Sequence, residues 1–247
     1  MKRRVFLALA VASAALPAGG QDYLREQRWK SEVLSSLVVG EAVRLELPSG
    51  VGFLGLYTEG RPGRPSVLLV HGAGVHPDHG VIGSLRIALA DRGLTTLSIQ
   101  MPVLAADARA EDYLPLFPDA GERIAAAAAW LQAGAHAPIV ILSHSLGAWM
   151  TERYLQSTKA TPFAAWICMG RSGPLVAPAR PIPILDVYGD RDLPPVLAHA
   201  EERRRTLERI PGSSQIVIAG ADHFYTGRES ELTDALVPFI EAAAARR

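Results

Sequence analysis

Six short apolar runs alternate with helix-like segments, and this alternation limits the possible folds more than any other feature of the chain. The runs are SVLLVH (66–71), LTTLSIQ (94–100), PIVILS (138–143), FAAWICM (163–169), IPILDVYG (182–189) and SQIVIAG (214–220). Leucine and β-branched residues follow one another in these runs with few polar interruptions, which is typical of strands covered on both faces. Helices between such strands predict a mostly parallel sheet with right-handed crossovers.

The remaining segments extend this pattern at both ends. Helices are expected over 22–37, 82–92, 119–134, 146–156, 194–209 and 231–245, the last with a Pro238 that could bend it. Asp119, with Glu122 three residues later, is the expected N-cap of its helix. The runs AVRLEL (42–47) and VGFLGLY (51–57) flank a Pro-Ser-Gly turn and favour a hairpin. We therefore expect about eight strands in a three-layer αβα sandwich.

Composition is consistent with one α/β domain. The chain has 247 residues, of which 49% are hydrophobic, and its 25 basic and 25 acidic residues give a formal net charge of +0. Without a long run of one sign, nothing indicates a nucleic-acid partner. Cys168 is the only cysteine, so an internal disulfide and a thiolate metal cluster are both excluded.

The first twenty residues have the layout of a secretory signal peptide. Basic residues at 2–4 precede an apolar stretch at 5–16, and small residues at 18–20 provide a cleavage site. The stretch is shorter than the roughly 20 residues that span a membrane. We expect residues 1–20 to be removed on export to the periplasm or medium, leaving 21–247 as a single domain. An uncleaved anchor is the alternative, and membrane contact is otherwise expected only through this transient segment.

A Ser-His-Ser-Leu-Gly tract joins the run at 138–143 to the following helix, and it is the strongest candidate for chemistry. It has the small-x-Ser-x-Gly form of a nucleophile elbow, with Ser143 and Gly147 as the small residues around Ser145. In such a turn the serine adopts a strained backbone, and the N–H of Leu146 faces the oxygen that becomes negative during acyl transfer. A loop that merely caps a helix is the alternative.

Other polar residues follow the ends of other strands. Because the carboxyl ends of parallel strands share one edge of the sheet, these residues are expected to meet near Ser145. His223, after the last strand, is the candidate general base, and Asp192 is the candidate that orients it. Asp190 is the alternative acid, since Asp192 could instead cap the next helix. The N–H of Ala73 is the second candidate oxyanion donor.

The chain order Ser145, Asp192, His223, with His71-Gly72 after an earlier strand, resembles the α/β-hydrolase superfamily. The stretches HGAGVHPDHG, TLSIQMP, SHSLGA and GADHFY are also similar to an exported bacterial family classed only as α/β-hydrolase-like and of unknown function. The resemblance implies the α/β-hydrolase fold and hydrolysis, but no substrate. Many hydrolases insert a lid where this chain has only the loop 170–181, so no large lid domain is expected. The loop 100–119 is expected to form an apolar wall.

A cluster of histidines follows the first buried strand. His71, His76, Asp78 and His79 could suggest zinc, but an oxyanion turn followed by a polar loop is the favoured interpretation, and neither a metal nor a cofactor is expected. The residues expected to line the cleft are His71, Gly72, His76, Asp78 and His144.

The sequence thus predicts an exported serine hydrolase that cleaves a small-molecule carboxylic ester or thioester through an acyl-enzyme. Two alternatives stay open. The chain could be a non-catalytic envelope protein that uses the fold as a binding scaffold, or an acyltransferase with the same three residues.

Overall fold

The computed structural model describes residues 20–136, 138–158 and 160–245. Residues 1–19, and with them nearly all of the expected signal peptide, lie outside the described residues. No helix in the described ranges is both long and apolar enough to cross a membrane.

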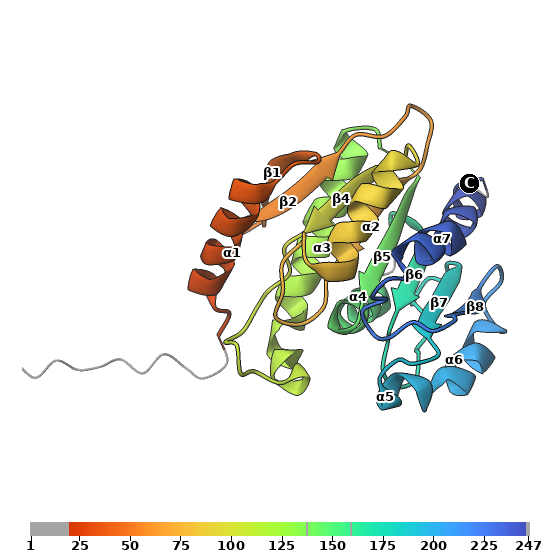
Figure 1. Cartoon of the computed structure of the whole chain (residues 1–247). Helices are drawn as coiled ribbons and strands as arrows, with labels where there is room; N and C mark the ends of the chain where they lie inside the picture. The colour runs from red at the N-terminus through yellow and green to blue at the C-terminus, as the bar shows by residue number, and fades with distance from the viewer. Residues whose placement is uncertain (1–19, 137, 159, 246–247) are drawn as a thin grey trace, which may run out of the picture.

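The described residues form one eight-stranded sheet in the order β1-β2-β4-β3-β5-β6-β7-β8 (Figure 1). Its strands are β1 (Glu41–Glu46), β2 (Gly52–Thr58), β3 (Ser66–Val70), β4 (Thr95–Ile99), β5 (Ile139–His144), β6 (Phe163–Met169), β7 (Ile184–Gly189) and β8 (Ser214–Ile218). Strand β2 is antiparallel to both β1 and β4, and every other pairing is parallel. The expected hairpin and the mostly parallel sheet are both confirmed.

Helices cover both faces of the sheet (Figure 1). They are α1 (Tyr23–Ser36), α2 (Gly80–Asp91), α3 (Phe117–Ala133), α4 (Leu146–Ser157), α5 (Pro194–Leu197), α6 (Ala200–Leu207) and α7 (Glu229–Ala244), with a 3₁₀ helix, η1 (Ala110–Leu116). Helices α2 and α7 share one core cluster, and α3 and α4 share the other. Along β3, Val67 belongs to the first cluster and Leu68 to the second. Alternate residues of this buried strand therefore serve opposite faces, as expected for a three-layer αβα sandwich.

The helices expected from 82 and 231 begin two residues earlier, at Gly80 and Glu229. Two other expectations about helices are wrong for a local reason. The helix expected from Asp119 begins at Phe117, because η1 runs directly into it. Leu116 is therefore the N-cap, and Asp119 lies in the first turn instead of capping the helix. The helix expected over 194–209 is two helices, because the backbone at His199 (φ −110°, ψ 6°) leaves the helical region between α5 and α6.

An ion pair ties the first helix to the body of the domain. The guanidinium of Arg123 on α3 donates to both carboxylate oxygens of Glu26 on α1, at 2.9 and 3.0 Å, and also to the Gln100 carbonyl at 2.8 Å. The Arg123 side chain is 1% exposed and that of Glu26 is 11% exposed. Because a buried guanidinium without its partner is strongly unfavourable, this bidentate pair fixes where α1 docks.

We expect Glu26→Ala to lower the free energy of unfolding by about 3 kcal/mol, because Arg123 would stay buried without its counter-charge. Glu46→Ala is the matched control, since Glu46 pairs with Arg44 at the surface, where both side chains are more than half exposed. That change should cost less than about 1 kcal/mol. Urea unfolding of both variants measures the difference, and equal costs would contradict the structural role given to Glu26.

Candidate active site

Ser145 sits in a sharp turn between β5 and α4. Its backbone has φ 56° and ψ −123°, a conformation that residues with a side chain rarely adopt. The turn is held by the Ser145 N–H, which donates to the Met169 carbonyl at 2.9 Å, and by the Ser145 carbonyl, which accepts from the Ala148 N–H at 2.9 Å. The serine therefore stays in the strained turn that the sequence predicts for a nucleophile elbow.

The two small residues of the elbow, Ser143 and Gly147, have different surroundings. A Cβ at Gly147 would lie 2.3 Å from the His71 carbonyl oxygen, so only glycine lets α4 approach the end of β3 this closely. Ser143 occupies the position that usually holds glycine. It is buried in β5, where its hydroxyl accepts a hydrogen bond from the Trp166 indole at 2.8 Å. Strand β6 thus supplies a partner for this extra hydroxyl.

We expect Gly147→Ala to destabilise the fold by at least about 2 kcal/mol, because the new methyl group must displace the backbone at His71. Gly121→Ala is the matched control. Gly121 also lies in a helix, but a Cβ there meets only the Tyr154 ring at 3.6 Å. Alanine should therefore stabilise that helix by roughly 0.5–1 kcal/mol. Denaturant unfolding that gave both changes the same sign would contradict this account of the elbow.

His223 links the serine to an acidic residue. Its Nε2 lies 2.9 Å from the Ser145 Oγ, and its Nδ1 lies 2.7 Å from Asp192 Oδ1. Asp192 is buried, and the same oxygen accepts the Leu193 N–H at 2.7 Å. A carboxylate on the Nδ1 side requires the proton to be on that nitrogen, which leaves Nε2 as the acceptor that faces the serine hydroxyl.

The structure separates the two candidate acids. The carboxylate of Asp190 is exposed and accepts the Gly220 N–H at 2.7 Å, so the alternative in which it faces His223 is wrong. Asp192 is also not the cap of the following helix, whose N-cap residue is Leu193. Gly189 explains the close packing of this turn, because a Cβ there would lie 2.1 Å from the Ala221 carbonyl oxygen.

The loop that carries His223 is held by several contacts. The His144 Nε2 is 2.9 Å from the His223 carbonyl oxygen, and the two rings are 4.8 Å apart. The carboxylate of Asp222 accepts the backbone N–H groups of Phe224 and Thr226 at 2.9 and 3.0 Å. Gly170 leaves room for the His223 ring, since a Cβ there would lie 3.0 Å from it. His144 therefore positions His223, in addition to lining the cleft as the sequence predicts.

Two backbone N–H groups near Ser145 are available to a ligand. Leu146 is the first residue of α4, and Ala73 lies in the loop after β3. Within the described ranges, neither N–H has a hydrogen-bond acceptor. The loop is held by Arg25 on α1, which donates to the Gly74 carbonyl at 3.0 Å and to the Leu104 carbonyl at 2.7 Å. Sequence patterns gave no indication of this role for Arg25, because it depends on where α1 docks.

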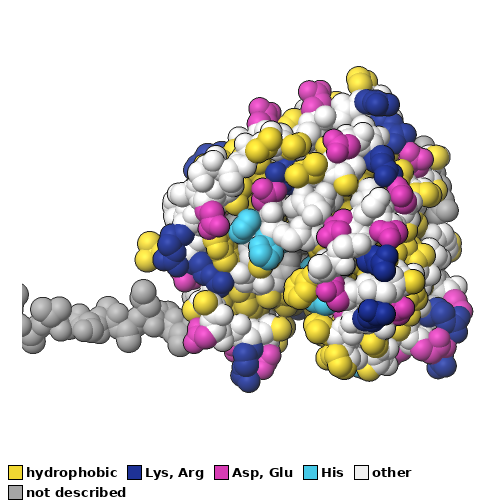
Figure 2. Space-filling model, viewed as in Figure 1, with side chains coloured by type: hydrophobic (Ala, Val, Ile, Leu, Met, Phe, Trp, Pro, Cys, Tyr) yellow, Lys and Arg dark blue, Asp and Glu magenta, His cyan; other side chains and the backbone are white. Residues whose placement is uncertain are grey.

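A cavity of about 220 Å³ adjoins the serine. It is lined by His71, Gly72, Ala73, Val75, His79, Gly80, Val81, Ile82, His144, Ser145, His223 and Phe224. Of the residues expected to line the cleft, His71, Gly72 and His144 do so. On the face shown in Figure 2, histidine side chains lie beside a hollow whose lower border carries hydrophobic side chains.

The expectation that His76 and Asp78 line this cavity is wrong. The carboxylate of Asp78 pairs with the buried guanidinium of Arg86 at 2.5 Å. The ring of His76 contacts those of Trp29 and His79, with centroid distances of 5.9 and 5.4 Å. Asp78 therefore anchors the loop, and His79 reaches the cavity in place of these two residues.

His71 is a structural residue. Its Nδ1 is 2.8 Å from the Gly72 carbonyl oxygen, and its Nε2 accepts the Met101 N–H at 2.9 Å. Both ring nitrogens are therefore engaged, and burial lowers the pKa of His71 to about 3. In the described part of the chain, no three side chains of His, Cys, Asp or Glu are arranged to hold a metal ion.

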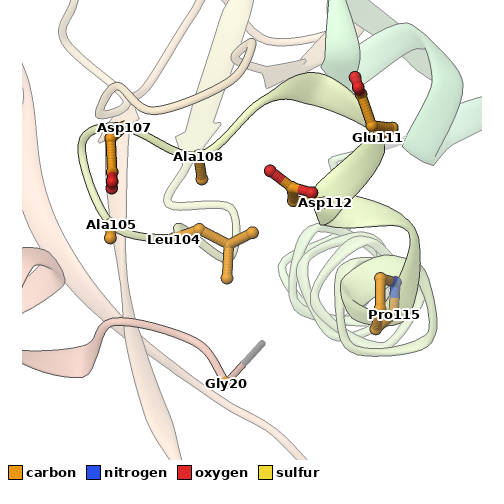
Figure 3. A pocket seen from close by; sticks show the side chains of 8 residues that line it. All are labelled: Gly20, Leu104, Ala105, Asp107, Ala108, Glu111, Asp112 and Pro115. Carbon is orange, nitrogen blue, oxygen red and sulfur yellow. The ribbon is translucent and has the colours of Figure 1, made fainter. Parts of the chain in front are cut away.

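A larger cavity, of about 600 Å³, lies elsewhere, between the loop 104–108, η1 and Gly20 (Figure 3). Its charged lining residues are the carboxylates Asp107, Glu111 and Asp112. It contains none of Ser145, His223 and Asp192. Among the described residues, no serine, cysteine or histidine lines it, whereas the smaller cavity contains a serine hydroxyl in contact with an imidazole, so the smaller cavity is the candidate site.

We expect the domain to lose stability in acid through its buried histidines. Burial, and then the neighbouring His223, lower the pKa of His144 to about 4. Since the unfolded side chain binds a proton near its usual pKa of about 6.5, the contribution of His144 is complete above that pH and is lost as the pH falls. His144 alone should account for about 2 kcal/mol between about pH 7 and about pH 4.5. In urea unfolding, His144→Asn should weaken this pH dependence, and an unchanged slope would refute the expectation.

Comparison with known proteins adds information at the level of the fold. No protein-family model matches the sequence, and no curated protein matches it significantly. Solved structures do match. An esterase from Pyrococcus furiosus has a TM-score of 0.65 and 15% identity, over 83% of this chain and 97% of that one. A dienelactone hydrolase from Anabaena variabilis has a TM-score of 0.65 and 20% identity, over 81% and 95%.

A serine hydrolase homologue from Coxiella burnetii is also similar, with a TM-score of 0.60 and 22% identity over 82% of this chain and 98% of that one. At such low identity these likenesses concern the fold. They agree with the order of the strands, the flanking helices and the short loop at 170–181, which leaves no room for a large lid domain. The chain therefore has the α/β-hydrolase fold.

Proposed function

We propose that the protein is a serine hydrolase that cleaves a carboxylic ester or thioester through an acyl-enzyme. The observation that carries the proposal is the unbroken chain of contacts from Ser145 Oγ to His223 Nε2, at 2.9 Å, and from His223 Nδ1 to Asp192 Oδ1, at 2.7 Å. A nucleophile within hydrogen-bond reach of a base, which is itself oriented by a buried carboxylate, is the arrangement that acyl transfer requires.

In the first half of the reaction, the Ser145 Oγ attacks the carbonyl carbon while His223 Nε2 takes the hydroxyl proton. The N–H groups of Ala73 and Leu146 stabilise the resulting oxyanion, and Asp192 stabilises the imidazolium. The tetrahedral intermediate then collapses. The bond to the leaving oxygen or sulfur breaks, and His223 Nε2 donates its proton to that atom.

In the second half, His223 takes a proton from water, which attacks the acyl carbon. Collapse of the second intermediate releases the carboxylic acid and returns the proton to Ser145. Every group in this scheme belongs to the protein, so the proposal requires no cofactor. The same acyl-enzyme could instead react with an alcohol, which would make the protein an acyltransferase.

The structural neighbours support the broader part of the proposal. They include an esterase, a dienelactone hydrolase and a serine hydrolase homologue, all with the same fold. We also propose that the protein acts outside the cytoplasm, because residues 2–20 have the pattern of a secretory signal.

We expect a fluorophosphonate probe to label the wild-type protein and not Ser145→Ala. Asp192→Asn should lower kcat for p-nitrophenyl acetate by about 10³-fold or more, because His223 would lose the acceptor that fixes its tautomer. Asp190→Asn is the matched control and should stay within about threefold of the wild type, because Asp190 contacts only a backbone N–H in this region.

Mass spectrometry of the labelled protein and steady-state kinetics measure these effects. A folded wild-type protein that is never labelled would favour the non-catalytic scaffold. Ester products formed in the presence of an added alcohol would favour acyl transfer. Equal losses in the two aspartate variants would remove Asp192 from the mechanism.

A further inference from the structure

Beside the elbow there is a second cavity, of about 230 Å³, which borders Leu146, the residue next to Ser145. Its lining residues are Ala110, Glu111, Leu114, Phe117, Leu146, Trp149 and Ser172, none of which lines the cavity that contains Ser145. The Ser145 cavity is bounded by the start of α2 and by the loop before α7. The second cavity is bounded by η1, α3 and α4. The two cavities thus lie towards opposite faces of the sheet, and neighbouring residues border them: Ser145 lines one and Leu146 the other.

We propose that these cavities hold the two halves of the substrate, with an apolar acyl group in the Leu146–Trp149 cavity and the leaving group beside His223. The inference rests on the proposed function, and it adds the substrate class: uncharged esters or thioesters whose acyl part is a hydrocarbon chain or an aromatic ring.

The chemistry of the reaction assigns the two halves. The tetrahedral carbon carries the Ser145 oxygen, the oxyanion, the leaving atom and the acyl carbon. The oxyanion faces the N–H groups of Ala73 and Leu146, and the leaving atom must lie within hydrogen-bond reach of His223 Nε2, which protonates it. His223 and Phe224 line the first cavity only. The acyl substituent therefore points to the remaining side, where the Leu146 side chain begins the second cavity.

The lining of the second cavity defines what the acyl group can be. Five of its seven residues are apolar, and the single hydroxyl, on Ser172, already accepts the Trp149 indole N–H at 3.3 Å. The only charged group is the carboxylate of Glu111. Glu111 is exposed and pairs with Arg109 at 3.2 Å, so the described lining offers no cation to an acyl chain that ends in its own carboxylate. A hydrocarbon chain would bury apolar surface on both partners.

Trp149 provides a fixed wall of this cavity. The guanidinium of Arg171 lies 4.3 Å from its ring centroid, and Arg171 is itself buried and paired with Glu152 on α4. The indole is therefore held from the side by Ser172 and on its face by Arg171. Leu114 also lines this cavity and is 56% exposed, and an exposed apolar side chain of this size gains from being covered by a ligand.

The test uses two series of substrates and two matched variants. The acyl series is p-nitrophenyl acetate, butyrate, hexanoate and octanoate, and the leaving-group series is butyrate esters of methyl, benzyl and naphthyl alcohols. Trp149→Ala should lower kcat/KM for hexanoate by about tenfold or more while changing acetate less than about threefold. It should leave the ranking of the alcohols unchanged.

Phe224→Ala is the reciprocal variant, because the Phe224 ring lies 5.2 Å from that of His223 on the leaving-group side. It should change the ranking of the alcohols and keep the ranking within the acyl series, because all members of that series share the p-nitrophenol leaving group and are affected alike. These outcomes together would support the division of the substrate between the two cavities.

The inference is overturned if Trp149→Ala and Phe224→Ala change both series equally, or if each affects the series assigned to the other. Fluorophosphonate labelling of every variant keeps this result separate from the proposed function. A wild-type protein that is not labelled would reject the hydrolase itself. Labelled variants with unchanged acyl preferences would reject only the assignment of the second cavity.

Discussion

The close approach of α4 to the end of β3 determines the geometry of the whole site. At Gly147 the helix backbone comes so near to the His71 carbonyl that no side chain fits between them. This contact brings the loop that holds Ala73 beside the elbow that holds Ser145. Because β3 and β5 are adjacent and parallel, their ends are already level, with Val70 paired with Ser143. The strain at Ser145 is therefore balanced by packing and hydrogen bonds on both sides of the turn.

Around this contact, buried polar groups fix the positions of loops and helices more than they stabilise the fold. The ring nitrogens of His71 contact the backbone of two loops. His144 contacts the His223 carbonyl oxygen, and Arg123 connects α3 to α1. A buried ion pair or a buried neutral histidine contributes little net free energy compared with apolar residues of the same size. Each of these hydrogen bonds and ion pairs requires a particular geometry, however. A loop that makes several of them therefore has few alternative positions.

The strand pattern and the chain order of Ser145, Asp192 and His223 were sufficient to predict the sheet and the residues that meet at its edge. Both depend on local sequence and on the rule that parallel strands end at one edge. Asp190 and Asp192 could not be separated in this way, because their roles depend on which carboxylate turns inward. Asp78 looked like a cleft residue until the structure paired it with Arg86, eight positions along the chain. The contact of Arg25 with the loop that holds Ala73 could not be predicted from the sequence, because its acceptors are backbone carbonyls, which every residue has.

The two faces of the sheet contribute differently to recognition. The leaving-group side is built from the start of α2 and the loop before α7. The Asp78–Arg86 pair anchors the first, and the contacts of His144 and Asp222 hold the second. The acyl side depends on η1, a short 3₁₀ helix within a loop whose apolar residues the sequence predicts but whose conformation it does not. Tyr113 and Leu116 fix η1 in the core, and the Tyr113 hydroxyl accepts the Leu104 N–H at 3.2 Å. Glu111 and Leu114 are exposed, so these two side chains can change without disturbing the three residues that carry the proposed chemistry. Selectivity for the acyl group can therefore vary while the elbow stays the same.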